Sequence, residues 1–145
     1  MLPKKMIVGM LALLLSACAG ASKPATDITV ELTDFAYTPS AITIPAGQPV
    51  VLTINNNGKV VHDFVVEKIE VTDVVAQNSG SGEHDMPGMG ESSPYDLHVA
   101  TGAGGTNTLQ FTALEPGTYK IFCTVEGHIE AGMIGELVVV EESNP

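Results

Sequence analysis

Three side chains that can bind soft metals stand at equal spacing near the end of the sequence. Cys123, His128 and Met133 lie in the stretch IFCTVEGHIEAGM, with four residues between each and the next. A thiol, an imidazole and a thioether together are typical ligands of a soft metal ion. Each also has an ordinary explanation, because a single inward Cys is often an inert core residue. Cys123 could therefore be a structural thiol, half of a disulfide, a nucleophile or a metal ligand.

Side-chain alternation along two predicted strands points Cys123 and a second imidazole toward the same interior. In the strand that ends at Cys123, Lys120 must face water, so Cys123 faces inward. In the strand that contains His62, Asp63 is expected to face outward, so His62 also points inward. Two strands can thus present a thiol and an imidazole to one region of the core.

The loop after Cys123 can complete this group. Its glycines, Gly127, Gly132 and Gly135, allow the chain to fold back so that His128 and Met133 approach Cys123. A thiolate and two imidazoles in a plane, with a weak thioether on the axis, form the ligand set of a type 1 copper centre. Together, His62, Cys123, His128 and Met133 match that ligand set.

Two long stretches of the sequence resemble the cupredoxin family of blue copper proteins. These are FAYTPSAITIPAGQPVVLTINNNGKVVHDFVV and GTYKIFCTVEGHIEAGMIGELVV, and the resemblance covers about residues 28–140. The resemblance implies one copper ion held by His62, Cys123, His128 and Met133, and the spacing of the last two of these ligands is similar to that of rusticyanin and sulfocyanin. The resemblance implies that His128 is the exposed ligand and that electrons pass through an apolar patch around it. Candidates for the patch are Ile129, Ala131 and Ile134.

Three acidic residues near the expected ligands depart from the usual family pattern. The residue after the upstream His is often Asn or Ser in the family, where it braces the ligand loop, but here it is Asp63. Glu126 and Glu130 lie within the ligand loop. A carboxylate close to the ion should favour Cu(II) and lower the reduction potential, so no relative's potential can be transferred to this chain.

The rest of the sequence predicts an all-β fold, an antiparallel Greek-key sandwich or barrel of about eight strands. Short alternating apolar runs are separated by the turn sequences PAGQ, NNNG, TGAGGTN and LEPGT, and no segment has sustained helical spacing. The expected strands are residues 28–32, 42–44, 50–55, 60–66, 95–100, 108–113, 118–123 and 134–140.

The first residues resemble an export signal with a lipid attachment site. Lysines precede a short apolar run, and Leu15-Ser16-Ala17-Cys18 resembles the lipobox of bacterial lipoproteins. We expect residues 1–17 to be a signal peptide, residues 18–26 a linker lipidated at Cys18, and residues 27–142 the cupredoxin domain. The protein is then exported and anchored at the periplasmic or other extracytoplasmic face of a membrane. A disulfide with Cys18 would tie the core to the linker and is disfavoured.

A polar, Gly/Ser-rich excursion at about residues 75–93 suggests an alternative function. It contains His84, Met86 and Met89, a soft set that could form a second, weak Cu(I) site, with His98 not far beyond. Such a site would suit a periplasmic copper-binding or copper-trafficking protein. The other interpretation is a loop whose His and Met residues are incidental.

Charge and burial limit the remaining functions. Seventeen acidic residues against six basic ones exclude nucleic acid and favour a basic redox partner, such as a c-type cytochrome or a membrane oxidoreductase. The acidity could also serve solubility alone.

Cys123 and His128 could act as nucleophile and base, but a buried Cys in an acidic protein is a poor nucleophile. A structural zinc site with these ligands is disfavoured, because Met is a poor zinc ligand. We expect a monomeric one-electron carrier, not an enzyme.

Overall fold

The protein, as a computed structural model, is described over residues 24–78 and 93–141, where it forms ten β-strands and no helix. Within the described ranges, no helix has the length and hydrophobicity needed to cross a bilayer. The strands are β1 (Asp27–Thr33), β2 (Ala36–Thr38), β3 (Ala41–Pro45), β4 (Pro49–Asn56), β5 (His62–Val66), β6 (Val71–Asn78), β7 (Leu97–Thr101), β8 (Thr106–Ala113), β9 (Gly117–Phe122) and β10 (Ile134–Val140).

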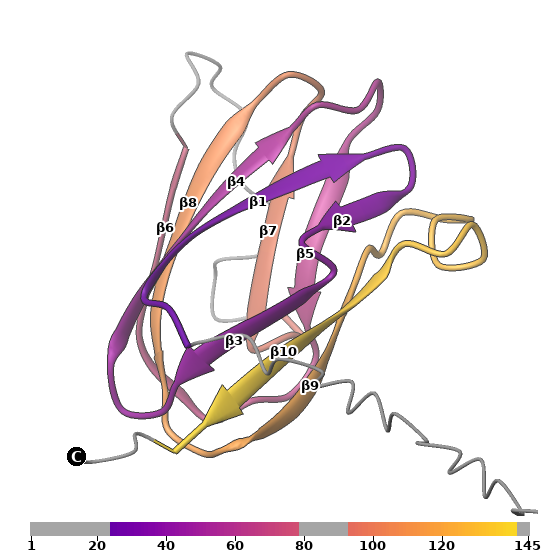
Figure 1. Cartoon of the computed structure of the whole chain (residues 1–145). Helices are drawn as coiled ribbons and strands as arrows, with labels where there is room; N and C mark the ends of the chain where they lie inside the picture. Colours follow the sequence, from indigo (N-terminus) through magenta and orange to yellow (C-terminus); the bar gives the residue numbers. More distant parts are fainter. Residues whose placement is uncertain (1–23, 79–92, 142–145) are drawn as a thin grey trace, which may run out of the picture.

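The strands form two five-stranded sheets that face each other, which confirms the predicted all-β fold (Figure 1). One sheet has the order β2-β1-β4-β8-β6 and the other β3-β10-β9-β5-β7. Two neighbouring pairs, β1 with β4 and β3 with β10, run parallel, whereas the strand pattern had predicted an antiparallel sandwich. The second sheet matters most for the site, because β5, β9 and β10 are neighbours in it.

Two of the ten strands, β2 and β6, were missed from the sequence. β2 has only three residues, too few to show an alternating pattern. β6 has a register shift between Thr72 and Val75, and Asp73 has a positive φ of 55°, so its apolar residues do not alternate. β6 also runs to Asn78, past the expected start of the Gly/Ser-rich excursion at about residue 75. Gly135, expected in the ligand loop, lies in β10.

The core fills the space between the sheets and extends up to the ends of β5 and β9. Phe64 and Phe111 are its largest fully buried side chains, and Cys123 and Met133 belong to the same cluster. All five residues of β5 are buried, because neighbouring strands flank it and side chains cover both of its faces. Asp63, expected to face water, is therefore only 5% exposed.

Candidate metal centre

The pairing of β5 with β9 places Cys123 beside the backbone of the His62 strand. Val65 lies opposite Phe122 in an antiparallel pair, so the residues that follow Phe122 run alongside those that precede Val65. As a result, the Asp63 amide donates a hydrogen bond to Cys123 Sγ at 3.3 Å. Cys123 and His62 are both fully buried, as their strand positions predicted.

The loop between β9 and β10 turns back on itself through short-range backbone hydrogen bonds. The His128 amide donates to the Val125 carbonyl at 3.1 Å, and the Met133 amide donates to the His128 carbonyl at 2.9 Å. Gly127 and Gly132 have φ values of 82° and 97°, a conformation that favours glycine. These turns return His128 to Cys123 and place Met133, which is fully buried, in the cluster that contains Cys123.

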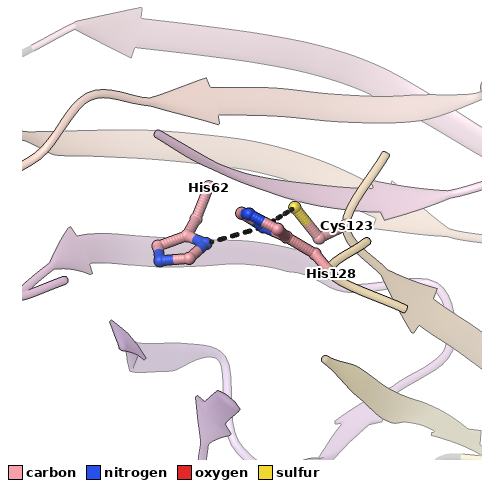
Figure 2. A group of neighbouring side chains, drawn as sticks. All are labelled: His62, Cys123 and His128. Carbon is pink, nitrogen blue, oxygen red and sulfur yellow. Dashed lines mark hydrogen bonds between the residues drawn. The ribbon is translucent and has the colours of Figure 1, made fainter. Parts of the chain in front are cut away.

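Three donor atoms converge at this end of the molecule (Figure 2). His128 Nδ1 lies 3.2 Å from Cys123 Sγ and 3.2 Å from His62 Nδ1. The three donor atoms all lie within 4.8 Å of one another, so one ion can reach them. Two imidazoles and a thiolate, with a buried thioether in the same cluster, suit copper better than the harder ions that prefer oxygen ligands.

His128 is the most exposed of these residues but is not open to solvent. It is 7% exposed, whereas His62, Cys123 and Met133 are fully buried, so the implied exposed ligand is largely covered. Phe35 provides part of this cover: its ring meets that of His128 edge-on, with 4.7 Å between centroids. The turn between β1 and β2, which carries Phe35, lies at the same end of the molecule as the ligand loop (Figure 1).

Asp34 is a site residue that the sequence did not reveal. Its Oδ1 lies 2.8 Å from His62 Nε2, and its two carboxylate oxygens accept the Lys59 amide at 3.1 Å each. The hydrogen bond with His62 is the main cause that holds the pKa of Asp34 below its ordinary value. No spacing signal marked Asp34, because only the fold places the β1–β2 turn beside His62.

Asp63 joins the two ligand strands through both its backbone and its side chain. The Thr124 hydroxyl donates to Asp63 Oδ2, and His98 Nε2 lies 3.5 Å from the same oxygen, a long contact. The Tyr37 hydroxyl donates to the Asp63 carbonyl at 2.6 Å. Burial raises the pKa of Asp63, but the contacts with His98 and Thr124 outweigh it, so the pKa lies below its ordinary value. Asp63 thus braces the ligand loop through Thr124, although it stands where the family often has Asn or Ser.

Cys123 has the environment of a metal ligand more than that of a free nucleophile. Burial raises the pKa of its thiol, and hydrogen bonds from the amides of Asp63 and Val125 offset only part of this effect. Within the part of the chain that the structure describes, its thiol forms no disulfide. A bound cation would replace the thiol proton and stabilise the thiolate that burial otherwise disfavours.

Several other predicted residues lie away from the donor atoms or outside the described ranges. Glu126 and Glu130 are exposed. Of the residues predicted to form an apolar patch, Ala131 and Ile134 are exposed, and Ile134 has an exposed fraction of 41%. Ile129 is half-buried and lines a groove with Phe122. The residues of the predicted second copper site and of the lipidation site lie outside the described residues: His84, Met86, Met89 and Cys18.

Known proteins resemble both the sequence and the fold. Residues 5–82, which include His62 but end before Cys123, match the family of cupredoxin-like domains. The chain is 32% identical over 120 residues to the copper-resistant cuproprotein CopI of Rubrivivax gelatinosus, covering 82% of this chain and 69% of that protein. It is 32% identical over 103 residues to plastocyanin A/B of Petroselinum crispum, covering 71% and 86%. The reduced auracyanin of Roseiflexus castenholzii has a similar structure, with a TM-score of 0.62 and 25% identity over 81% of this chain and 99% of that chain.

Proposed function

The chain belongs to the cupredoxin-like family and binds copper, and we propose that it carries single electrons between membrane-associated redox partners. The observation that carries this proposal is the convergence of Cys123 Sγ and two imidazole Nδ1 atoms in a buried position. Met133 would be the fourth ligand. A buried site with soft and borderline donors is suited to both oxidation states of copper.

The protein's own contribution is to hold the donor atoms in place. Copper, when bound, supplies a one-electron redox couple at a single ion. His62 and Cys123 come from neighbouring strands, and His128 from a loop fixed by its own backbone hydrogen bonds. Because the protein's own contacts hold the donor atoms together, the site would need little rearrangement when the copper changes oxidation state, as a fast electron carrier requires.

Apolar side chains around the site offer a place for a partner to dock. Phe35, Val60, Val61 and Ile134 are each 40–44% exposed, and we call them the apolar rim. Phe35 contacts His128, the two valines immediately precede His62, and Ile134 immediately follows Met133. An apolar contact here would bring a partner's redox centre close to His128. The acidic surface would favour a basic partner, such as a c-type cytochrome or a membrane oxidoreductase.

We propose that the protein works outside the cytoplasm and that it is a monomer. We also propose that it is not an enzyme. A lipid on Cys18 would confine it to a membrane surface and restrict diffusion to two dimensions. The complete burial of Cys123 argues against a nucleophile, although His128 lies within proton-transfer distance of it. Mass spectrometry of protein expressed in a bacterium would test the anchor, since a diacylated Cys18 at the N-terminus is expected.

A visible spectrum tests the copper site, and voltammetry tests the carrier function. Metal-free protein titrated with Cu(II) should develop an intense thiolate-to-copper charge-transfer band at one equivalent. Voltammetry should then give a reversible one-electron wave, and reduced protein should pass its electron to a basic c-type cytochrome more slowly at high salt. A colourless one-to-one complex would contradict the type 1 site. A coloured protein with no reversible wave would contradict the carrier function alone.

The similarity to a copper-resistant cuproprotein supports a second candidate, copper handling. In that function, His84, Met86 and Met89 would hold a second, exchangeable Cu(I) ion. Titration with Cu(I) separates the candidates: a labile second equivalent that disappears when Met86 and Met89 are replaced by Leu would favour trafficking. A single tightly held copper, unaffected by these replacements, would favour the carrier.

A further inference from the structure

The two nitrogens of His62 face different partners. Nδ1 points to His128 Nδ1 at 3.2 Å, within the group of donor atoms, while Nε2 lies 2.8 Å from Asp34 Oδ1. A neutral imidazole carries a proton on one nitrogen and a lone pair on the other. Because a carboxylate can only accept, the proton belongs on Nε2, and Nδ1 is left with the lone pair that a metal needs.

The position of Asp34 is fixed from two sides. The Lys59 amide donates to both carboxylate oxygens, so the carboxylate cannot rotate freely. Gly58 packs directly against the contact, because a Cβ at this position would lie 2.5 Å from Asp34 Oδ1 and 2.7 Å from His62 Nε2. The Gly58 amide is in turn held by Asn56 Oδ1 at 2.9 Å. The β4–β5 loop is thus shaped to leave room for the hydrogen bond between Asp34 and His62.

The charge of Asp34 persists although the residue lies near the surface. Its side chain is 28% exposed, and an Asp carboxyl in contact with water is ionised at neutral pH. A carboxylate that accepts the outer N–H of a metal-bound imidazole orients the ring and makes it a stronger donor. A stronger, more negative donor environment favours the more highly charged Cu(II).

We propose that Asp34 is a positioning residue of the copper site, which sets the tautomer of His62 and lowers the reduction potential of the bound copper. This inference rests on the copper site proposed above. The competing explanation is structural: Asp34 merely caps the Lys59 amide, and its contact with His62 has no effect on the metal. The two explanations predict different effects of a neutral side chain of the same shape: only the positioning role predicts that the reduction potential changes.

The test replaces Asp34 in the full chain and follows the copper. Asp34→Asn keeps an acceptor oxygen but removes the charge. We expect a 10- to 100-fold loss of Cu(II) affinity, the usual range for such partners, with a smaller effect on Cu(I). The reduction potential should rise by about 59 mV for each tenfold change in the ratio of the two affinities. Gly58→Ala, which would force the pair apart, should shift the potential in the same direction.

Asp96→Asn is the matched control. Asp96 accepts the Ile69 amide at 2.8 Å and contacts Lys68 Nζ at 3.4 Å, so it also combines a backbone cap with an ionic contact. Neither of these partners is a ligand of the proposed site. Its replacement removes the same charge, and the potential should stay close to that of the wild type. Equal shifts in Asp34→Asn and Asp96→Asn would overturn the proposal, since only net charge would then matter.

A second measurement needs no copper. Nitrogen-15 NMR of the metal-free protein should show the His62 proton on Nε2, and Asp34→Ala should move part of the population to the Nδ1 tautomer. A wild-type proton on Nδ1, or a tautomer unchanged in Asp34→Ala, would overturn the proposal. If the wild type forms no coloured copper complex, the proposed site fails, while the tautomer measurement still decides whether Asp34 positions His62.

Discussion

The Thr124 hydroxyl donates a hydrogen bond to the Asp63 carboxylate, so the residue after Cys123 is joined to the residue after His62. The Asp63 amide meanwhile donates to Cys123 Sγ. Two expected ligands, which lie far apart in the sequence, are therefore held by direct contacts between their neighbours. This arrangement explains how the protein's own contacts bring the donor atoms together.

Loss of the Thr124 hydroxyl should weaken this link. Thr124→Val keeps the shape of the side chain but leaves the nearly buried Asp63 carboxylate with the Thr124 amide and the long contact to His98. We expect the metal-free protein to lose about 1–3 kcal/mol of stability, measured by urea unfolding. Thr124→Ser, which retains a hydroxyl, is the control and should lose less than half as much. Equal losses in both variants would mean that the methyl group, not the hydrogen bond, stabilises this end.

Removal of the Asp63 charge should raise the reduction potential. Asp63→Asn can still accept the Thr124 hydroxyl, but it no longer places a negative charge beside the thiolate strand. Since a nearby negative charge favours Cu(II), its loss should raise the potential by roughly 59 mV, equivalent to a tenfold change in relative affinity. Voltammetry of the copper-loaded variant gives the value. A fall in potential would contradict the argument.

The Tyr37 hydroxyl should contribute measurably to stability because its hydrogen bond is buried. It donates to the Asp63 carbonyl at 2.6 Å, and burial is the main cause that raises the pKa of Tyr37. Tyr37→Phe leaves that carbonyl without this donor and should cost about 1–3 kcal/mol in urea unfolding. Tyr119→Phe is a matched control, since its hydroxyl donates to the Glu115 carbonyl in an exposed contact. Its cost should stay within about 0.5 kcal/mol.

The sequence predicted the strand-borne part of the site but not the side chains around it. The inward direction of His62 and Cys123 follows from alternation along their own strands, which is a local property. Asp34 and Phe35 reach His62 and His128 from a turn that is distant in the sequence, and local patterns carry no information on that contact. Asp63 was expected to face water, because alternation does not reveal that Thr124 and His98 would cover it.

The ring of Phe35 should keep the site dry. It lies edge-on to His128, with centroids 4.7 Å apart, and is 6.1 Å from His62, so Phe35→Ala should open both imidazoles to water. Water stabilises the more highly charged Cu(II), so the potential should fall, and added azide should perturb the visible spectrum more strongly than in the wild type. Phe35→Leu, which remains apolar, should give an intermediate result. An unchanged reduction potential in Phe35→Ala would contradict the idea that Phe35 keeps water from the site, and would leave partner docking as the role of Phe35.

Replacement of Cys123 should separate metal binding from folding. The core cluster is formed by side chains from both sheets, so Cys123→Ser should keep the far-ultraviolet circular dichroism of the wild type. The charge-transfer band should vanish, because serine supplies no thiolate. Copper should stabilise the wild type by about 4 kcal/mol at a free concentration 1,000 times its Kd, and chelation should reverse this gain. In Cys123→Ser the same copper concentration should give a much smaller shift in unfolding midpoint. A variant that unfolds outright would show that the thiol is part of the core's stability, whereas an undiminished shift would place the copper at other ligands.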